Sequence, residues 1–265
     1  MNLEPIIYRD MTKRPFYYCA KFGGKILPDK KQRGGALPLY MQISELLSRE
    51  IAAGIWPDGT RLPTEANLAA HLGVAVGTLR KSLADLEEKK LLERIQGSGT
   101  YVRKRAKSGS IYEFLHLELK SGAGLPTAQI LSLDKCPCPD FLPPFGDSSS
   151  HHAWRVRRLR FLGKTPAALE EIWFDARHAA SLDIESMPEA MHLFYRQNLN
   201  FWIARVEDAV SVSPCPDFAP SDGPFTQGTP LGYVERVSWG NADTVEEFSR
   251  NWFDPSTVAY VARWA

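Results

Sequence analysis

Two short helices joined by a tight turn are the feature that most constrains the fold of this chain. The first begins at Thr64 and is stopped by Gly73, and the second runs over about 77–89 with its leucines on one face. A longer amphipathic helix precedes them, beginning at Pro38 and ending near Gly54. Three helices in this order, with a glycine in the last turn, predict a helix-turn-helix unit.

A glycine-rich hairpin is predicted directly after the third helix. In LLERIQGSGTYV, apolar residues flank Gly97, Ser98 and Gly99, and glycines permit the positive backbone angles of a tight turn. A helix-turn-helix followed by a hairpin is a winged helix. The wing of such a domain lies along the phosphate backbone or in a minor groove of DNA.

The charge of the chain is unevenly distributed. Residues 30–107 hold fourteen Lys or Arg against eight Asp or Glu, a balance of +6, whereas the rest carries 18 against 23, or −5. This asymmetry indicates that one module faces a polyanion. A composition of 44% hydrophobic and 24% charged residues, with no apolar run of about 20 residues, predicts a folded cytoplasmic protein.

The four cysteines are too few and too scattered for a disulfide scaffold. Cys136 and Cys138, followed by His151 and His152, suggest a metal site. Structural zinc sites, however, favour two or more residues between paired cysteines, and prolines hold this segment extended. We therefore expect a proline-rich loop and no metal.

The pattern changes to strands from residue 111 onward. WRVRRLRFLGKTPAALEEIWF predicts two strands joined at Gly163 and Lys164, and further strand-like runs are FWIARVEDAVSVSP, LGYVERVSWG and VAYVARWA. Residues 188–197 are compatible with a helix. The second half is therefore expected to be an antiparallel α+β domain, and the fold class of the whole chain is α+β.

The first of these modules resembles the winged helix of the GntR family of bacterial transcription regulators almost end to end. The shared framework is PLY.QI, then I..G...G..LP.E..LA...GV...T.R..L..L, then G.GT.V. The remainder, from about Ile111, is similar to the ligand-binding domain of the HutC subfamily, known as UTRA, which is shaped like chorismate lyase. Its anchors are RRLRFLGKTPAALEE and GTPLGYVERVSWGNADTVEEFS.

The resemblance implies an N-terminal extension (1–37), a winged helix-turn-helix domain (38–104), a linker (105–110) and an effector-binding and dimerisation domain (111–265). In the family, a homodimer binds a pseudo-palindromic DNA operator, and a small effector in the C-terminal domain changes the spacing of the two winged helices. The implied function is therefore a sequence-specific transcriptional regulator, taken here as a repressor. The resemblance implies neither catalysis nor a cofactor.

The resemblance also implies which residues contact DNA. Arg80 lies one turn into the third helix, where it can reach a guanine edge or clamp a phosphate. Thr78 offers its hydroxyl to a phosphate or caps the helix. In the wing, Gly97 contacts DNA or serves only the turn. The expected DNA-binding set is Thr64, Thr78, Arg80, Gln96, Gly97 and Ser98.

Two positions depart from the family pattern. Many relatives place arginines where this chain has Ala66 and Val76. Each missing bidentate contact removes on the order of 1–3 kcal/mol of base discrimination. We therefore expect an operator that differs from the common family consensus, or recognition that rests more on the wing and on DNA shape.

The effector site is expected on the predicted strands. Arg158 and Arg160 share one face of a strand, and Glu170 follows on the returning strand. Together with Glu246, they match the two arginines and two glutamates that line the UTRA ligand site. Paired arginines suit a carboxylate or phosphate, so a small acidic or phosphorylated metabolite is expected. A plain cross-strand salt bridge would give the same spacing.

This site also departs from its type. Trp252 or Phe253 stands where many relatives carry a polar wall, and SPCPDFAPSDGPF occupies the region where a small helix is expected. Two other readings of the whole chain stay open. One is a chorismate-lyase-like enzyme acting on a small acid, because fold does not fix function. The other is a regulator or scaffold with weak sequence specificity, which Ala66 and Val76 would allow.

Overall fold

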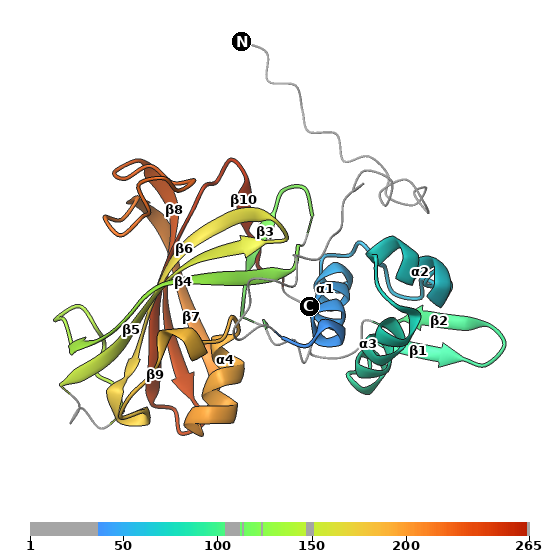
Figure 1. Ribbon diagram of the computed structural model, residues 1–265, viewed down its shortest axis with the longest axis horizontal. Coiled ribbons are helices and arrows are strands. Elements are labelled where there is room, and N and C mark those ends of the chain that lie inside the picture. The colour runs from blue at the N-terminus through green and yellow to red at the C-terminus, as the bar shows by residue number, and fades with distance from the viewer. Residues whose placement is uncertain (1–36, 104–111, 113, 123, 147–150, 264–265) are drawn as a thin grey trace, which may run out of the picture.

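The computed structural model of the chain describes residues 37–103, 112, 114–122, 124–146 and 151–263. The extension expected over 1–37, except its last residue, and the linker expected over 105–110 lie outside these described residues. The chain folds into a helical body with a hairpin and a second body built on a β-sheet (Figure 1). Within the described ranges, no helix is both long and apolar enough to cross a membrane.

Three helices form the first body, as the sequence predicts: α1 (Leu39–Ala52), α2 (Glu65–Leu72) and α3 (Val76–Glu88). Gly73 ends α2 in the left-handed conformation (φ 67°), which a glycine adopts without steric cost. The helices share one core of fully buried aliphatic side chains, among them Ile43, Leu47, Leu79, Leu83 and Leu86. The turn between α2 and α3 is therefore a helix-turn-helix turn, although α3 begins one residue earlier than expected.

The predicted hairpin is present. Strands β1 (Leu92–Ile95) and β2 (Gly99–Val102) pair antiparallel, and residues 96–98 form the turn. Gly97 has φ +74° and Gly99 has φ +136°. A Cβ on Gly99 would also lie 2.7 Å from Nε of Arg61. Figure 1 shows this wing pointing away from the sheet body.

The second body is an antiparallel six-stranded sheet in the order β4-β5-β6-β9-β8-β7. The strands are β4 (Pro126–Pro137), β5 (His152–Leu162), β6 (Thr165–Asp175), β7 (Ile203–Pro214), β8 (Pro230–Gly240) and β9 (Val245–Phe253). The predicted β5–β6 turn at Gly163 is confirmed, since Gly163 has φ +63°. Strands β4 and β9 were not predicted from the sequence. The end of β4 was expected to be a proline-rich loop.

Short elements complete the second body. Helix α4 (Met191–Phe194) continues into a π-helical turn, η6 (Tyr195–Leu199), where residues 188–197 predicted a helix. The 3₁₀ turns η4 (Ala176–His178) and η5 (Ile184–Ser186) follow β6. A two-stranded sheet joins β3 (Leu117–Leu119) to β10 (Val258–Tyr260). Residues 215–229, where a small helix is expected, form turns instead.

Candidate functional sites

An ion-pair cluster brings α2, α3 and the wing together on the helical body. The Arg80 Nε donates to Oε2 of Glu65 over 2.6 Å, and one NH2 group of Arg94 donates to Oε1 of the same carboxylate over 3.3 Å. The Arg80 side chain is 65% exposed and that of Arg94 is 48% exposed. A polyanion therefore has access to both guanidiniums. Arg94 was not among the expected DNA contacts, although a basic residue one position before the end of β1 is visible in the sequence.

The two threonines of the expected set have different local roles. Thr64 caps α2, because its Oγ1 accepts a hydrogen bond from the backbone N–H of Asn67 at 3.4 Å. Thr78 does not cap α3. The N-cap of that helix is Ala75, which makes no side-chain cap bond, so the capping role weighed for Thr78 is wrong. Thr78 lies in the first turn of α3, two residues before Arg80.

The wing turn presents its expected residues to solvent. Gln96 and Gly97 are exposed, and the half-buried Ser98 hydroxyl lies 2.7 Å from the Tyr101 hydroxyl. Ala66 and Val76, the two departures from the family pattern, lie in the first turns of α2 and α3. Because neither position carries a cation, the exposed guanidiniums of Arg80 and Arg94 lie outside the turn between α2 and α3.

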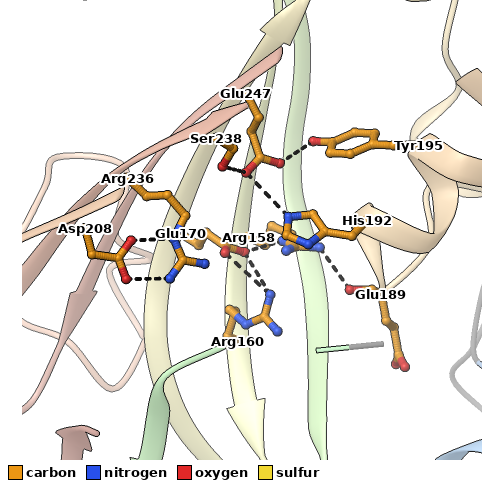
Figure 2. A network of polar contacts seen from close by, with 10 residues as sticks. All are labelled: Arg158, Arg160, Glu170, Glu189, His192, Tyr195, Asp208, Arg236, Ser238 and Glu247. Carbon is orange, nitrogen blue, oxygen red and sulfur yellow. Dashed lines mark hydrogen bonds and ion pairs between the residues drawn. The ribbon is translucent and has the colours of Figure 1, made fainter. Parts of the chain in front are cut away.

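A small pocket with a cavity volume of about 50 Å³ lies on one face of the six-stranded sheet, beneath α4 and the segment around residue 114. Sites for small ligands typically have volumes of roughly 300–1,000 Å³, so a ligand of that size would have to displace some of the lining side chains. Charged groups converge in it from several strands (Figure 2). Its lining residues are Tyr112, Phe114, Leu115, Arg158, Arg160, Glu170, Ile172, Ala190, Met191, His192, Arg236, Glu247 and Ser249.

Three of the four expected effector residues meet at the centre of this pocket. Glu170 lies opposite Arg158 in the β5–β6 pair, and its Oε2 accepts from Arg158 Nε at 2.5 Å and from an Arg160 NH1 at 3.2 Å. Burial alone would raise the pKa of the Glu170 carboxyl, but the two guanidiniums outweigh this and lower that pKa to about 2. The cluster is therefore fully ionised although it is buried.

A third arginine, which the sequence reading missed, faces the same pocket. Arg236 on β8 donates from Nε and NH2 to the two oxygens of Asp208 over 2.5 and 2.6 Å. The Tyr260 hydroxyl donates to the same carboxylate at 2.6 Å. The two bonds from Arg236 to Asp208 use two of the five N–H donors of the Arg236 guanidinium. The pocket thus carries three arginines against two lining glutamates.

The second glutamate of the pocket is Glu247, not Glu246. Ser238 pairs with Glu247 and Trp239 with Val245, so the register shift leaves Glu246 without a partner across the β8–β9 pair. Glu247 is 2% exposed and accepts from the Tyr195 hydroxyl at 2.7 Å. Glu246 lies outside the lining and bonds instead to His178 and Thr244.

The alternation of residues along β9 could have identified Glu247. Glu247, Ser249 and Asn251 are polar and share one face of the strand, whereas Phe248 and Trp252 are apolar and point to the other. His192, on α4, completes this side of the pocket with its Nε2 3.6 Å from Oε1 of Glu247.

The remaining candidates lie outside the pocket. Trp252 packs against Phe218 and Tyr233, and Phe253 is buried in a separate apolar cluster, so neither replaces a pocket wall. Cys136 lies in β4, and burial raises the pKa of its thiol. The described residues contain no group of three or more His, Cys, Asp or Glu side chains arranged to hold a metal ion.

Comparisons with known proteins agree with this arrangement. The family model described as bacterial regulatory proteins, gntR family, matches residues 39–102, and the UTRA domain model matches residues 122–259. The HTH-type transcriptional regulator SmoD of Agrobacterium fabrum (strain C58) is 46% identical over 233 residues, covering 88% of this chain and 99% of that protein.

A second relative and a solved structure extend the comparison. The mannosyl-D-glycerate transport/metabolism system repressor MngR of Escherichia coli (strain K12) is 31% identical over 83% of this chain and 93% of its own length. The crystal structure of the possible transcriptional regulator YydK from Bacillus subtilis has a TM-score of 0.50 at 21% identity, over 86% of this chain and all of that one, which shows the fold.

The family matches rule out the enzyme reading, because both modules are those of transcription regulators rather than catalysts. The helical body is the DNA-binding unit, and the sheet body with its charged pocket is the effector-binding unit. The chain therefore belongs to the GntR family of bacterial transcription regulators, in the HutC subfamily, whose members join a winged helix-turn-helix to a UTRA domain.

Proposed function

We propose that the chain is a repressor that binds a pseudo-palindromic operator as a homodimer, and that a small anionic, polyhydroxylated metabolite bound in the UTRA pocket changes its operator affinity. The cluster of Arg158, Arg160 and Glu170 carries this proposal. It lies inside a pocket rather than on a solvated sheet face, and Arg236 adds a further cation to the lining.

The chemistry of the lining selects the ligand class. Guanidinium groups bind carboxylate, phosphate or sulfonate groups through paired N–H donors, whereas the carboxylates of Glu170 and Glu247 accept from hydroxyl groups. A ligand that carries one anionic group and several hydroxyls satisfies both. The named MngR system handles a sugar linked to glycerate, and this substrate combines the same two features.

Thermal unfolding with a ligand panel tests the proposed class. Ligands that bind only the folded state raise the melting temperature as their concentration exceeds Kd. We expect glucose 6-phosphate or glucuronate to raise it, whereas glucose, which lacks the anionic group, does not. Arg160→Gln removes one cation of the pocket and should abolish the shift, while Arg155→Met, on the opposite sheet face, should retain it. Equal shifts with glucose would contradict an anionic effector.

The proposed DNA interface comprises Arg80, Thr78 and Thr64 on the helical body and Gln96, Gly97 and Ser98 in the wing. Exposure of the Arg80 guanidinium and its tie to Arg94 through Glu65 support this surface. Operator binding places the protein in the cytoplasm, where the bacterial chromosome lies. The domain limits proposed for this function are 38–104 for DNA binding and 111–265 for effector binding and dimerisation.

The outer edge of β7 is the surface that we propose for dimerisation. β7 ends the sheet, and no strand in the described part of the chain pairs with its outer side. Val210 is 53% exposed and Val212 72%, and residues 209–213 contain neither a charged residue nor a proline. Free apolar edges usually carry charged or proline gatekeepers, because they pair with other strands. A two-fold antiparallel pairing about Ser211 would place Val210 opposite Val212 of the second copy.

Sedimentation velocity of the full chain tests this interface. Val212→Lys introduces two like-charged side chains at the proposed contact, so we expect the dimer to dissociate and operator affinity to fall. Ser186→Lys, on η5 in the same domain, is the matched control and should stay dimeric. A Val212→Lys variant with unchanged sedimentation would place the dimer contact elsewhere.

A further inference from the structure

A buried arginine on α1 joins the DNA-binding body to the effector body. Arg49 is 7% exposed and donates from NH1 to the Leu115 carbonyl at 3.2 Å and from NH2 to the Leu117 carbonyl at 2.7 Å. Its Nε–H has no hydrogen-bond partner among the described residues. One side chain of the helix-turn-helix body thus holds two backbone groups of the other body.

The backbone that Arg49 holds belongs to the pocket wall. Tyr112, Phe114 and Leu115 line the effector pocket. Tyr112 lies under the Arg160 guanidinium, 5.7 Å from it, and joins a buried cluster with Leu37 just before α1. A ligand that moves the Arg160 side chain would therefore act on the segment 112–117, whose carbonyls at Leu115 and Leu117 accept hydrogen bonds from Arg49.

The electrostatic surroundings of Arg49 point in the same direction. Burial lowers the pKa of the Arg49 guanidinium, the carboxylates of Glu45 and Glu118 oppose this, and the positive charge of Arg160 adds to it. The guanidiniums of the pocket and of α1 therefore repel each other through a poorly solvated interface. Neutralising Arg160 with an anionic ligand would relieve this repulsion.

Apolar contact between the two bodies is also present. Leu125, the residue before β4, is 1% exposed and joins the aliphatic core of the helical body. This contact holds the bodies together without reaching the pocket lining. Met41 of α1 also packs against the cluster of Leu37, Tyr112 and Ala190, so apolar contact reaches the pocket wall as well, while Arg49 supplies hydrogen bonds to that wall.

We propose that Arg49 is the positioning residue that transmits the state of the effector pocket to the DNA-binding domain, through the carbonyls of Leu115 and Leu117. The inference rests on the proposed function, since it supplies the physical link by which a pocket ligand alters operator affinity. An effector shifts operator affinity only if the two states of the dimer differ in contacts between the domains. Arg49 provides such a contact.

A double-mutant cycle without ligand tests this inference. The operator is a duplex selected from a random pool by the full-length wild-type chain. Its Kd is measured for the wild type, Arg160→Gln, Arg49→Met and the double variant. Arg160→Gln removes the pocket charge as an anionic ligand would neutralise it, and we expect it to change Kd at least about fivefold in the wild type. In the Arg49→Met background the change should fall below about twofold.

Controls separate transmission from simple loss of structure. Arg155→Met removes another partly buried, ion-paired arginine, on the sheet face opposite the pocket, and should leave the Arg160→Gln effect unchanged. Arg49→Lys retains the charge with a single donor group, so the Arg160→Gln effect in that background should lie between about twofold and fivefold. If Arg49→Met does not fold, Arg49→Lys replaces it in the cycle, and this intermediate value is then the expected result.

Two outcomes would overturn the inference: the same Kd change in both backgrounds, or no change on Arg160→Gln in the wild type. Because no ligand enters the cycle, a wrong effector class would appear only in the thermal panel. The two failures are therefore distinguishable.

Discussion

The arginines of the DNA-binding body and those of the effector pocket make the same kind of ion pair in opposite surroundings. Arg80 and Glu65 have side chains that are 65% and 28% exposed, whereas Arg158 and Glu170 are 2% and 9% exposed. Exposed ion pairs contribute little to the free energy of unfolding. Breaking a buried pair is strongly destabilising, because it leaves an unpaired charge that water cannot solvate. The first set is thus available to a partner at little structural cost, and the second is part of the fold as well as of the site.

Glu170→Gln should give the largest effect on stability. The substitution leaves Arg158 and Arg160 buried side by side without their carboxylate, so the free energy of unfolding should fall by about 3–5 kcal/mol. Urea denaturation followed by circular dichroism measures it. The matched control is Glu65→Gln, which removes the carboxylate of the exposed cluster and should change stability by less than about 0.5 kcal/mol. If both variants lost the same free energy of unfolding, the buried and the exposed ion pairs would not differ in their contribution to stability.

The same carboxylate should make stability depend on pH. The folded-state pKa of Glu170 is about 2, below its usual value of 4.5. Its contribution is therefore complete above that usual value and is lost as the pH falls through 4.5 toward 2. The lost stability is on the order of 3 kcal/mol.

Urea midpoints between pH 6 and pH 2 measure this loss. The difference between wild type and Glu170→Gln should shrink as the pH falls, whereas the difference between wild type and Arg80→Ala should stay constant. A Glu170→Gln difference that is independent of pH would show that ionisation of Glu170 does not stabilise the fold.

Arg80→Ala should reverse the pattern of Glu170→Gln. We expect an unchanged unfolding free energy but a loss of about 1–3 kcal/mol in binding to the selected operator, because a bidentate contact to a base is removed. Fluorescence anisotropy with the operator and with a scrambled duplex measures both affinities. If the two duplexes lost affinity equally, Arg80 would contact phosphate rather than a base.

Gln96→Ala should have the smallest effect. Gln96 is exposed at the wing tip, so its removal should leave stability unchanged and weaken operator binding by less than about 1 kcal/mol. The salt dependence of Kd should stay the same, because the amide is uncharged. Arg94→Ala, on the adjoining strand, is the comparison. If the Arg94 guanidinium contacts a phosphate, its removal should lower the slope of log Kd against log salt concentration by about one.

The DNA-binding body was largely predictable because its signals are local. Gly73, the leucines of α3 and the glycines of the wing each set the conformation of their own few residues, and the structure confirms the helices and the hairpin that they predict. The start of α3 was misjudged by one residue, and with it the role of Thr78. Helix ends depend on single hydrogen bonds and are therefore the least determined part of such a pattern.

The pocket was predictable only in part. Period-two alternation placed Arg158 and Arg160 on one face, and the Gly163 turn placed Glu170 opposite them. The alternation of β9 puts Glu247 on the face of Ser249 and Asn251, so it could have corrected the choice of Glu246, which lies at the register shift between β8 and β9. Arg236 and His192 reach it from elements that lie far from β5 in the sequence, and no spacing rule connects them.

By itself, the sequence determined the helix-turn-helix, the wing, the β5–β6 hairpin and the family, because each rests on periodicity, glycine positions or a continuous framework of residues. Only the tertiary structure decided which charges share the pocket and how the two bodies meet at Arg49. Those contacts join residues that are distant in the chain, and a single bulge or strand order changes them without altering any local pattern.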